Sequence, residues 1–268
     1  VTSGKGGVGK SNTAINLAIQ FRKMGKKVVI LDADFGLANI EIMFGAVPKH
    51  NLSDLIYQGK NIKDIITWGP MEVGFISGGS GITGLSNLSK DYLTYIVHNL
   101  AELDTIADVI IVDTGAGISD AVLEFLVASG EILLVTTPEP TSITDSYSLL
   151  KALNGHPGLE RDNTQICMIA NRVSAANEGE VLFQKLDVVV SRYLKLPITY
   201  LGAVPQDPLL AKAVMQQLPV SLQNPQARSA QAYEEIAAKL MKQDEGQNTQ
   251  KRGVAAFFSH IIGKRNNG

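Results

Sequence analysis

The sequence predicts an α/β fold in which a mostly parallel sheet is covered by helices on both faces. Short apolar, β-branched runs recur along the 268 residues, and stretches with helical periodicity separate them, as in parallel sheets that are buried on both sides. In this architecture ligands bind at the carboxyl ends of the strands, so functional residues are expected there. The predicted strands occupy residues 28–31, 73–76, 109–112, 132–136, 166–170 and 198–201.

The first element is a strand-like segment, 1–3, that runs directly into a glycine-rich loop. Residues 4–11 read GKGGVGKS and match the phosphate-binding pattern GxxxxGKS, and an amphipathic stretch follows. Its glycines let consecutive backbone N–H groups converge on phosphate oxygens at the positive end of a helix. Lys10 is expected to reach the β- and γ-phosphates and Ser11 to bind Mg²⁺. The expected nucleotide-binding residues here are Gly4, Lys5, Gly6, Gly7, Val8, Gly9, Lys10, Ser11 and Asn12.

Aspartates directly follow two of the predicted strands. Asp32 and Asp34 come after one strand, and Asp113 comes after another. A carboxylate beside a phosphate loop can hold Mg²⁺ through water, and Asp113 is expected in that role, with Ser11 and Asp32 as the other residues of the metal site. Asp34 is expected to orient an attacking water. Each aspartate could instead cap a helix or stabilise a turn, and this alternative is strongest for Asp32.

A second lysine, Lys5, has no evident task within one subunit, because Lys10 already supplies the expected cation. It could be a solvated surface charge. Residues 5–11, KGGVGKS, resemble the deviant phosphate loop of the MinD/ParA family. The resemblance implies ATP or ADP with Mg²⁺ as cofactor, and a slow, partner-stimulated ATPase with Lys5, Lys10 and Asp34 as catalytic residues. It also implies an ATP-bound homodimer in which Lys5 crosses to the nucleotide of the second copy.

Two further motifs support this similarity, which extends from residue 1 to about 238. Asn171 and Arg172 resemble the family's adenine-contacting pair, and the asparagine amide could read a purine edge. Pro205, Gln206 and Asp207 resemble a second loop on the adenine side, where backbone groups face the base. Asparagine and Pro-Asp pairs are also frequent turn residues, so only their order and position along the chain give them weight.

Within the family, several stretches resemble the branch of flagellar-number regulators known as FlhG, FleN and YlxH. They read DADFGLANIEIMFG, GGSGI, DTGAGIS and TTPEPTSITDSYSLLK. The resemblance implies a regulator of flagellar number or placement that works with an SRP-type flagellar GTPase (FlhF) and with flagellar C-ring proteins (FliM, FliN and FliY). A division-site ATPase of the MinD type and a DNA-partitioning ATPase of the ParA type stay open as alternatives.

The expected domain layout is an ATPase domain over 1–241, a polar linker over 242–250 and an amphipathic helix over 251–265. Apolar side chains of this helix share one face, and basic residues flank it with no acid between them. The residues expected to bind a membrane are Val254, Phe257, Phe258, Ile261, Ile262, Lys264 and Arg265. The pattern is typical of a helix that lies in an anionic membrane surface, so the expected location is cytoplasmic and reversibly peripheral on the cell membrane. The same face could instead pack on the chain's own domain.

Composition and charge argue against several other classes. A net charge of −2 gives no global reason to expect nucleic-acid binding. The single cysteine, Cys167, lies in an apolar run and is expected to be a buried thiol, which excludes a disulfide framework and argues against a metal-cluster carrier. No apolar run approaches the roughly 18 residues that span a bilayer. The chain does not begin with methionine, so further residues are expected before Val1.

Overall fold

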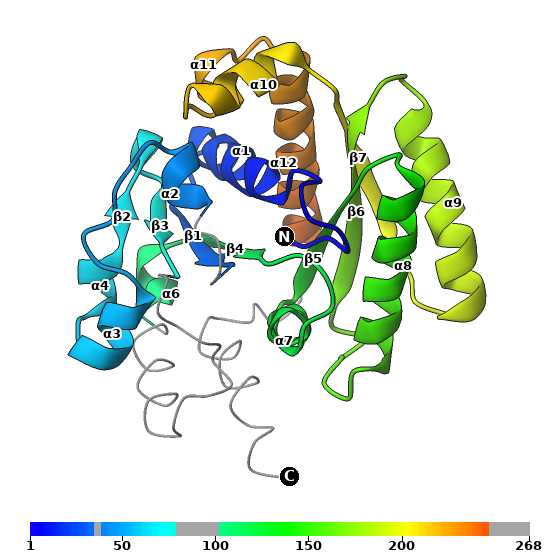
Figure 1. Cartoon of the computed structure of the whole chain (residues 1–268), viewed down its shortest axis with the longest axis horizontal. Helices are drawn as coiled ribbons and strands as arrows, with labels where there is room; N and C mark the ends of the chain where they lie inside the picture. Colours follow the sequence, from blue (N-terminus) through cyan, green and yellow to red (C-terminus); the bar gives the residue numbers. More distant parts are fainter. Residues whose placement is uncertain (35–38, 79–101, 247–268) are drawn as a thin grey trace.

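The computed structural model describes residues 1–34, 39–78 and 102–246, and the predicted α/β fold is confirmed (Figure 1). The strands are β1 (Val28–Ala33), β2 (Thr67–Trp68), β3 (Gly74–Ile76), β4 (Val109–Thr114), β5 (Glu131–Thr136), β6 (Gln165–Val173) and β7 (Thr199–Pro205). The helices are α1 (Lys10–Lys23), α2 (Ile40–Met43), α3 (Leu52–Gln58), α4 (Ile62–Ile65), the 3₁₀ turn η1 (Pro70–Glu72), α6 (Leu103–Ile106), α7 (Asp120–Ala128), α8 (Pro140–Gly155), α9 (Glu178–Tyr193), α10 (Pro208–Met215), α11 (Val220–Gln223) and α12 (Arg228–Gly246).

Parallel pairing dominates the strands that the structure describes. β1 lies between β3 and β4, and β6 lies between β5 and β7, with every one of these pairs parallel. β2 is the exception, because it pairs antiparallel with β3 at the edge. β2 was not predicted, since Thr67 and Trp68 alone are too short to form a pattern.

The segment 1–3 joins the two groups of strands. On the β4 side, the Thr114 N–H donates to the Val1 carbonyl (3.1 Å). On the β5 side, the Val135 N–H donates to the Thr2 carbonyl (2.9 Å), and Thr2 forms a parallel bridge there. The strand order is therefore β2-β3-β1-β4, then segment 1–3, then β5-β6-β7. The phosphate loop begins where this central segment ends.

Helices cover both faces of this sheet, as the alternation of side chains along a strand requires. Val28 and Ile30 of β1 pack in a core with α1, α10, α11 and α12. Val29 and Leu31 point to the opposite face, where α3, α4, α6 and α7 cover them. α8 and α9 cover the same opposite face beside β5 and β6. Cys167 lies fully buried in the first core, as predicted.

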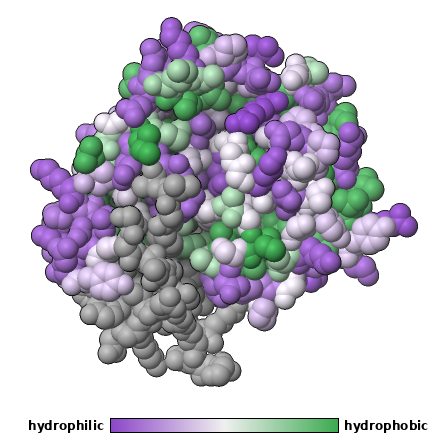
Figure 2. Space-filling view, in the orientation of Figure 1, coloured by the Kyte–Doolittle hydropathy of each residue, from purple (hydrophilic) through white to green (hydrophobic). Residues whose placement is uncertain are grey.

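The C-terminal part of the chain is described only through α12. This helix continues to Gly246, so the first residues of the expected linker are helical. The rest of the linker and the stretch 251–265, with all its predicted membrane-binding residues, lie outside the described residues. No helix of the described part is long and apolar enough to cross a membrane. Figure 2 shows polar side chains over much of one face, with apolar side chains in separate patches.

Candidate nucleotide-binding site

The predicted phosphate loop is a tight turn between segment 1–3 and α1. Gly9 adopts φ 99° at the N-cap of α1 and Gly7 adopts φ 74°, which lie in the left-handed region that favours glycine. Gly4 packs against α8, where an added Cβ would lie 2.1 Å from the carbonyl carbon of Asp145. The first turn of α1 carries no acidic residue, so its positive end is available to an anion.

The loop's side chains are arranged around this turn. Val8 and Lys10 are buried, while Ser11 and Asn12 are half-buried on the first turn of α1. The glycines at 6 and 7 are exposed. The backbone N–H groups of the first turn of α1 and the buried Lys10, which lies near Asp113, are the groups that a phosphate site requires.

Asp113 lies at the carboxyl end of β4, next to this turn. It is 1% exposed, and neither carboxylate oxygen accepts a hydrogen bond from the described residues. Burial raises the pKa of Asp113, and the nearby Ser11 hydroxyl and Lys10 ammonium partly offset the rise. A buried carboxylate without donors needs a cation or water as its partner. The structure thus brings together Ser11, Lys10 and Asp113, as the sequence predicts.

Mg²⁺ fits this place. The ion binds proteins through few carboxylates, keeps several of its waters and takes further oxygens from phosphates. Among the described residues, no three His, Cys, Asp or Glu side chains form a cluster that could hold a metal ion by themselves. Ser11 and the orphaned Asp113 would therefore hold a hydrated ion together with the phosphates of a nucleotide.

Asp32 ends β1 directly opposite Asp113 in the register of the two strands. Its carboxylate accepts hydrogen bonds from the backbone N–H groups of Asp34 (3.2 Å), Asn39 (3.0 Å) and Ile40 (3.3 Å). Burial and the neighbouring Asp113 raise the pKa of Asp32 to about 7. In this structure the Asp32 side chain accepts from backbone at the start of α2, which agrees with the structural alternative raised for it above, and its role as a metal ligand stays a prediction.

Asp34 faces the loop that follows β4. An added Cβ at Gly115 would lie 3.8 Å from the Asp34 Oδ1, so the two segments are in near contact. The Gly117 N–H donates to the Ser3 carbonyl (3.0 Å), which ties the same loop to the segment before the phosphate loop. Both segments therefore meet beside the phosphate loop, where a residue that orients water would have to lie.

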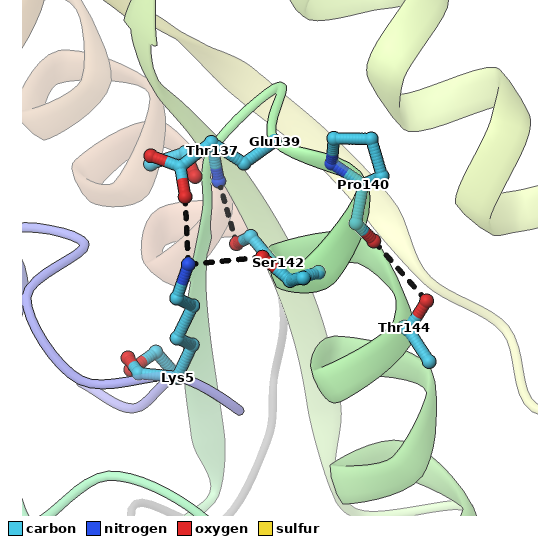
Figure 3. Close-up of polar contacts among 8 residues, drawn as sticks. Lys5, Thr137, Glu139, Pro140, Ser142 and Thr144 are labelled. Carbon is cyan, nitrogen blue, oxygen red and sulfur yellow. Dashed lines mark hydrogen bonds and ion pairs between the residues drawn. The ribbon is translucent and has the colours of Figure 1, made fainter.

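Lys5 points away from the phosphate loop toward the start of α8 (Figure 3). Its Nζ donates to Glu139 Oε2 (2.7 Å) and to Thr141 Oγ1 (2.9 Å). The Lys5 side chain is 36% exposed, and the Lys5 ammonium lowers the pKa of Glu139. In this structure the ammonium is paired within its own subunit, at the surface.

Glu139 and Thr141 were not among the residues predicted for the site. Glu139 is the N-cap of α8 and follows β5 at the same sheet edge as the aspartates. Its position after a strand is the signal that could have found it. The pairing with Lys5 joins residues 134 positions apart, and nothing in the local sequence predicts such a contact.

The predicted adenine pair lies at the end of β6. Asn171 is buried, and its amide donates to the Val8 carbonyl (2.7 Å) and accepts from the Arg172 N–H (2.9 Å). Arg172 is exposed and adopts φ 59°. The structure therefore places Asn171 against the phosphate loop, with one amide hydrogen and one oxygen lone pair left for another partner.

The second predicted adenine segment, Pro205 to Asp207, connects β7 to α10. The Gln206 N–H donates to the Val173 carbonyl (2.9 Å). Asp207 caps α10 through the Leu209 N–H, and its Oδ2 accepts from the N–H and hydroxyl of Ser229. Burial raises the pKa of Asp207, but these hydrogen bonds more than offset it, so the pKa lies below its usual value. The Asp207 side chain is thus structural here, and a contact between the backbone of this loop and a base stays a prediction.

Comparisons with known proteins agree with this fold. The sequence model of a family described as ParA: NUBPL iron-transfer P-loop NTPase matches residues 1–241. The antiactivator FleN of Pseudomonas aeruginosa is 38% identical over 240 residues, which cover 90% of this chain and 84% of FleN. The flagellum site-determining protein YlxH of Helicobacter pylori is 34% identical over 266 residues, which cover 98% of this chain and 88% of YlxH.

A solved structure shares the architecture. The septum site-determining protein MinD complexed with Mg-ADP, from Pyrococcus horikoshii, matches with a TM-score of 0.70 and 23% identity, over 91% of this chain and 95% of that one. Together with the family match and the two relatives, this agrees with the resemblance seen in the phosphate loop. The chain belongs to the MinD/ParA family of P-loop NTPases.

Proposed function

We propose that the chain is an ATPase switch that forms a homodimer with Mg-ATP, associates with an anionic membrane surface in that state, and regulates the number or placement of flagella. The phosphate loop, Ser11 and Asp113 would hold Mg-ATP. Asn171, Arg172 and the loop at Pro205 to Asp207 would lie at the base. Slow ATP hydrolysis would let the dimer dissociate into monomers.

Nucleotide binding is supported above all by one observation. A glycine-rich loop suited to an anion lies beside the buried carboxylate of Asp113, which accepts no hydrogen bond from the described residues. When bound, Mg²⁺ neutralises charge on the phosphates. The chain's own residues then supply position: Lys10 stands at the start of α1, and Asp34 stands opposite Gly115, where it can orient a water. Phosphoryl transfer depends mainly on such placement and on electrostatics.

The dimer part is supported by Lys5. Its ion pair with Glu139 is at the surface, where solvent and salt screen such pairs and they contribute little to stability. Exchanging Glu139 for a phosphate oxygen of a second copy would therefore cost little. A cation between two subunits is stable only when an anion accompanies it, so ATP would be part of the interface.

The flagellar part is supported by the two relatives, whose names are antiactivator FleN and flagellum site-determining protein YlxH. By resemblance, an SRP-type flagellar GTPase and C-ring proteins are the proposed partners. Division-site placement of the MinD type, or DNA partitioning of the ParA type, would be the function if these partners do not bind. A chain with net charge −2 offers no general attraction to DNA.

The description of the family model includes iron transfer, but Cys167 does not suit such a role here. It is the single cysteine of the chain and is fully buried. Burial, together with the neighbouring Glu131, raises the pKa of the thiol to about 12. Metal clusters bind thiolates, usually several of them. A lone, neutral, buried thiol therefore favours the switch over a metal carrier.

Sedimentation and liposome flotation with ADP or ATP test the switch. The wild type should be monomeric with ADP, and with ATP it should be dimeric and bound to anionic liposomes. Asp34→Ala should stay dimeric and membrane-bound with ATP because it cannot hydrolyse the nucleotide, whereas Lys5→Ala should stay single. A wild type that remains single under saturating ATP would rule the dimer out.

The tail is tested in the same flotation assay. Replacing Phe257 and Phe258 with Glu should abolish liposome binding while ATP-dependent dimers still form, since each buried large apolar side chain contributes roughly 1.5 to 3 kcal/mol. Two weak tails on one dimer bind through their high effective concentration, so dimerisation should control membrane binding. Unchanged flotation would refute the tail's role. Complementation of a bacterium that lacks its own flagellar-number regulator tests the cellular role.

A further inference from the structure

The amide of Asn171 is held between the phosphate loop and the backbone of its own strand. Its Nδ2 donates to the Val8 carbonyl (2.7 Å), and its Oδ1 accepts from the Arg172 N–H (2.9 Å). The side chain is 2% exposed. A flipped amide would bring two donors together at Arg172 and two acceptors together at Val8, so only one orientation is compatible with both partners.

The backbone of β6 is irregular at this point. Its register against β7 shifts between Asn171 and Val173, and Arg172 adopts φ 59°. A bulge of this kind re-aims the side chains beside it. Here Asn171 faces the protein interior and Arg172 is exposed. The left-handed conformation is uncommon for arginine and persists only where the surroundings hold it, as the hydrogen bond to Asn171 does.

The phosphate loop is shaped to receive this amide. An added Cβ at Gly9 would lie 2.3 Å from the Asn171 Nδ2, which is closer than any real contact. Gly9 is therefore required twice, once for its φ of 99° and once for the space that Asn171 fills.

The contact has a direct consequence for phosphate binding. The Val8 carbonyl and the Gly9 N–H belong to one planar trans peptide, so they point in opposite directions. When Asn171 holds the carbonyl, the Gly9 N–H is directed away from β6. Gly9 is the N-cap of α1, where backbone N–H groups gather around an anion. The orientation of this peptide thus sets one of the groups that phosphates would meet.

We infer that Asn171 is a positioning residue of the phosphate loop, because it fixes the orientation of the Val8–Gly9 peptide. It thereby connects the segment predicted to contact the base with the loop predicted to bind the phosphates. The inference rests on the proposed nucleotide binding. It differs from the predicted role of Asn171 as a base reader, because a residue that positions the loop acts equally on every nucleotide, whatever its base.

Asn171→Asp tests this with little change of shape. The carboxylate can still accept from the Arg172 N–H, but it cannot donate to the Val8 carbonyl and repels it. Isothermal titration with Mg-ADP and Mg-IDP, whose bases differ at the purine edge, measures both roles at once. Loss of the positioning contact should weaken both ligands by the same factor, about ten-fold or more, with the ADP:IDP preference unchanged. A changed preference with unchanged IDP binding would overturn the inference and identify a base reader.

Asn16 provides the matched control. It is fully buried on α1, its amide donates to the Asn12 carbonyl (2.8 Å), and it accepts from the Ser221 N–H (3.0 Å), so it has the same pattern of hydrogen bonds but makes none with the Val8–Gly9 peptide. Asn16→Asp should lower the thermal midpoint by a similar amount while ADP affinity stays within about two-fold. If Asn16→Asp weakens ADP as much as Asn171→Asp does, the effect is one of general stability and the positioning role is wrong.

A double-mutant cycle gives an independent test. Gly9→Ala should weaken ADP strongly in the wild type, because its Cβ collides with the Asn171 amide, and less in an Asn171→Ser background, where the shorter side chain leaves space. Asn171→Ser also serves if Asn171→Asp does not fold. Additive effects of the two changes would overturn the inference. A wild type that binds neither ADP nor IDP would instead refute the proposed function.

Discussion

The carboxyl ends of β1 and β4 place two aspartates directly opposite each other, and their surroundings are opposite in kind. Asp32 accepts hydrogen bonds from the backbone N–H groups of Asp34, Asn39 and Ile40. Asp113, equally buried, accepts none from the described residues. The same residue type at the same edge of the sheet is thus structural in one strand and available to a ligand in the next. Hydrogen-bond satisfaction, and not burial, separates the two roles.

The largest expected effect comes from Asp113→Asn. If Asp113 holds hydrated Mg²⁺, the loss of its charge should lower ATP hydrolysis by about 10- to 100-fold, as is common for residues that support a metal through its outer ligands. Phosphate release over a Mg²⁺ titration measures this, and excess Mg²⁺ should restore part of the rate. If Asp113→Asn hydrolyses ATP as fast as the wild type at limiting Mg²⁺, Asp113 does not support the metal ion and does not differ from Asp32 in this respect.

The next effect is on stability, and it belongs to Asp32. Asp32→Asn keeps only one acceptor oxygen, so either the Asp34 N–H or the N–H groups of Asn39 and Ile40 lose their partner, whichever way the amide points. The free energy of unfolding should fall by about 1 to 3 kcal/mol. Urea unfolding without nucleotide measures it. If this variant is as stable as the wild type, the turn into α2 does not depend on Asp32.

Asp113→Asn should have a smaller effect in the same urea experiment. Among the described residues no backbone N–H donates to its carboxylate, and an asparagine oxygen can still face the nearby Ser11 hydroxyl, so the free energy of unfolding should stay within about 1 kcal/mol of the wild-type value. It therefore serves as the matched control for Asp32→Asn. A loss as large as that of Asp32→Asn would mean that Asp113 too is mainly structural.

Glu139→Gln should have the smallest effect. It removes the charge that pairs with Lys5 at the surface, where such pairs contribute little, so the urea unfolding midpoint should stay close to that of the wild type. The Lys5 ammonium keeps its hydrogen bond to Thr141 but loses its paired carboxylate, so the ATP concentration needed for dimers should not rise. Sedimentation over an ATP series measures this. A clear rise would mean that Glu139 assists the interface directly.

Much of the fold could be predicted, because each strand longer than two residues carries an apolar run that a sheet buried on both faces demands. All six predicted runs correspond to strands, with ends that differ by a few residues: the run at 166–170 became β6, which continues to Val173. β2 was missed because it is held by pairing with β3 and not by its own pattern. An alternating or continuous apolar pattern indicates a buried strand, and a two-residue strand at the edge of a sheet is too short to show such a pattern.

The site was predictable where a motif fixes the chemistry, and not where distant contacts decide it. The sequence predicts Ser11 and Asp113 in one site, and the structure brings the two side chains near each other, while their role in binding Mg²⁺ stays a prediction. The sequence favoured a cap or turn role more for Asp32 than for Asp113, but it could not show which backbone N–H groups donate to the Asp32 carboxylate. Nor could it foresee that Asn171 would contact Val8, because that contact depends on a bulge and on the space at Gly9.

Segment 1–3 holds the two groups of strands together and also leads into the phosphate loop. Any ligand that orders the loop should therefore slow the opening of the sheet at its middle. The Thr114 and Val135 amides, which donate to Val1 and Thr2, lie on the two sides of this seam. In hydrogen–deuterium exchange, both amides should gain protection together when nucleotide binds, although neither lies in the phosphate loop.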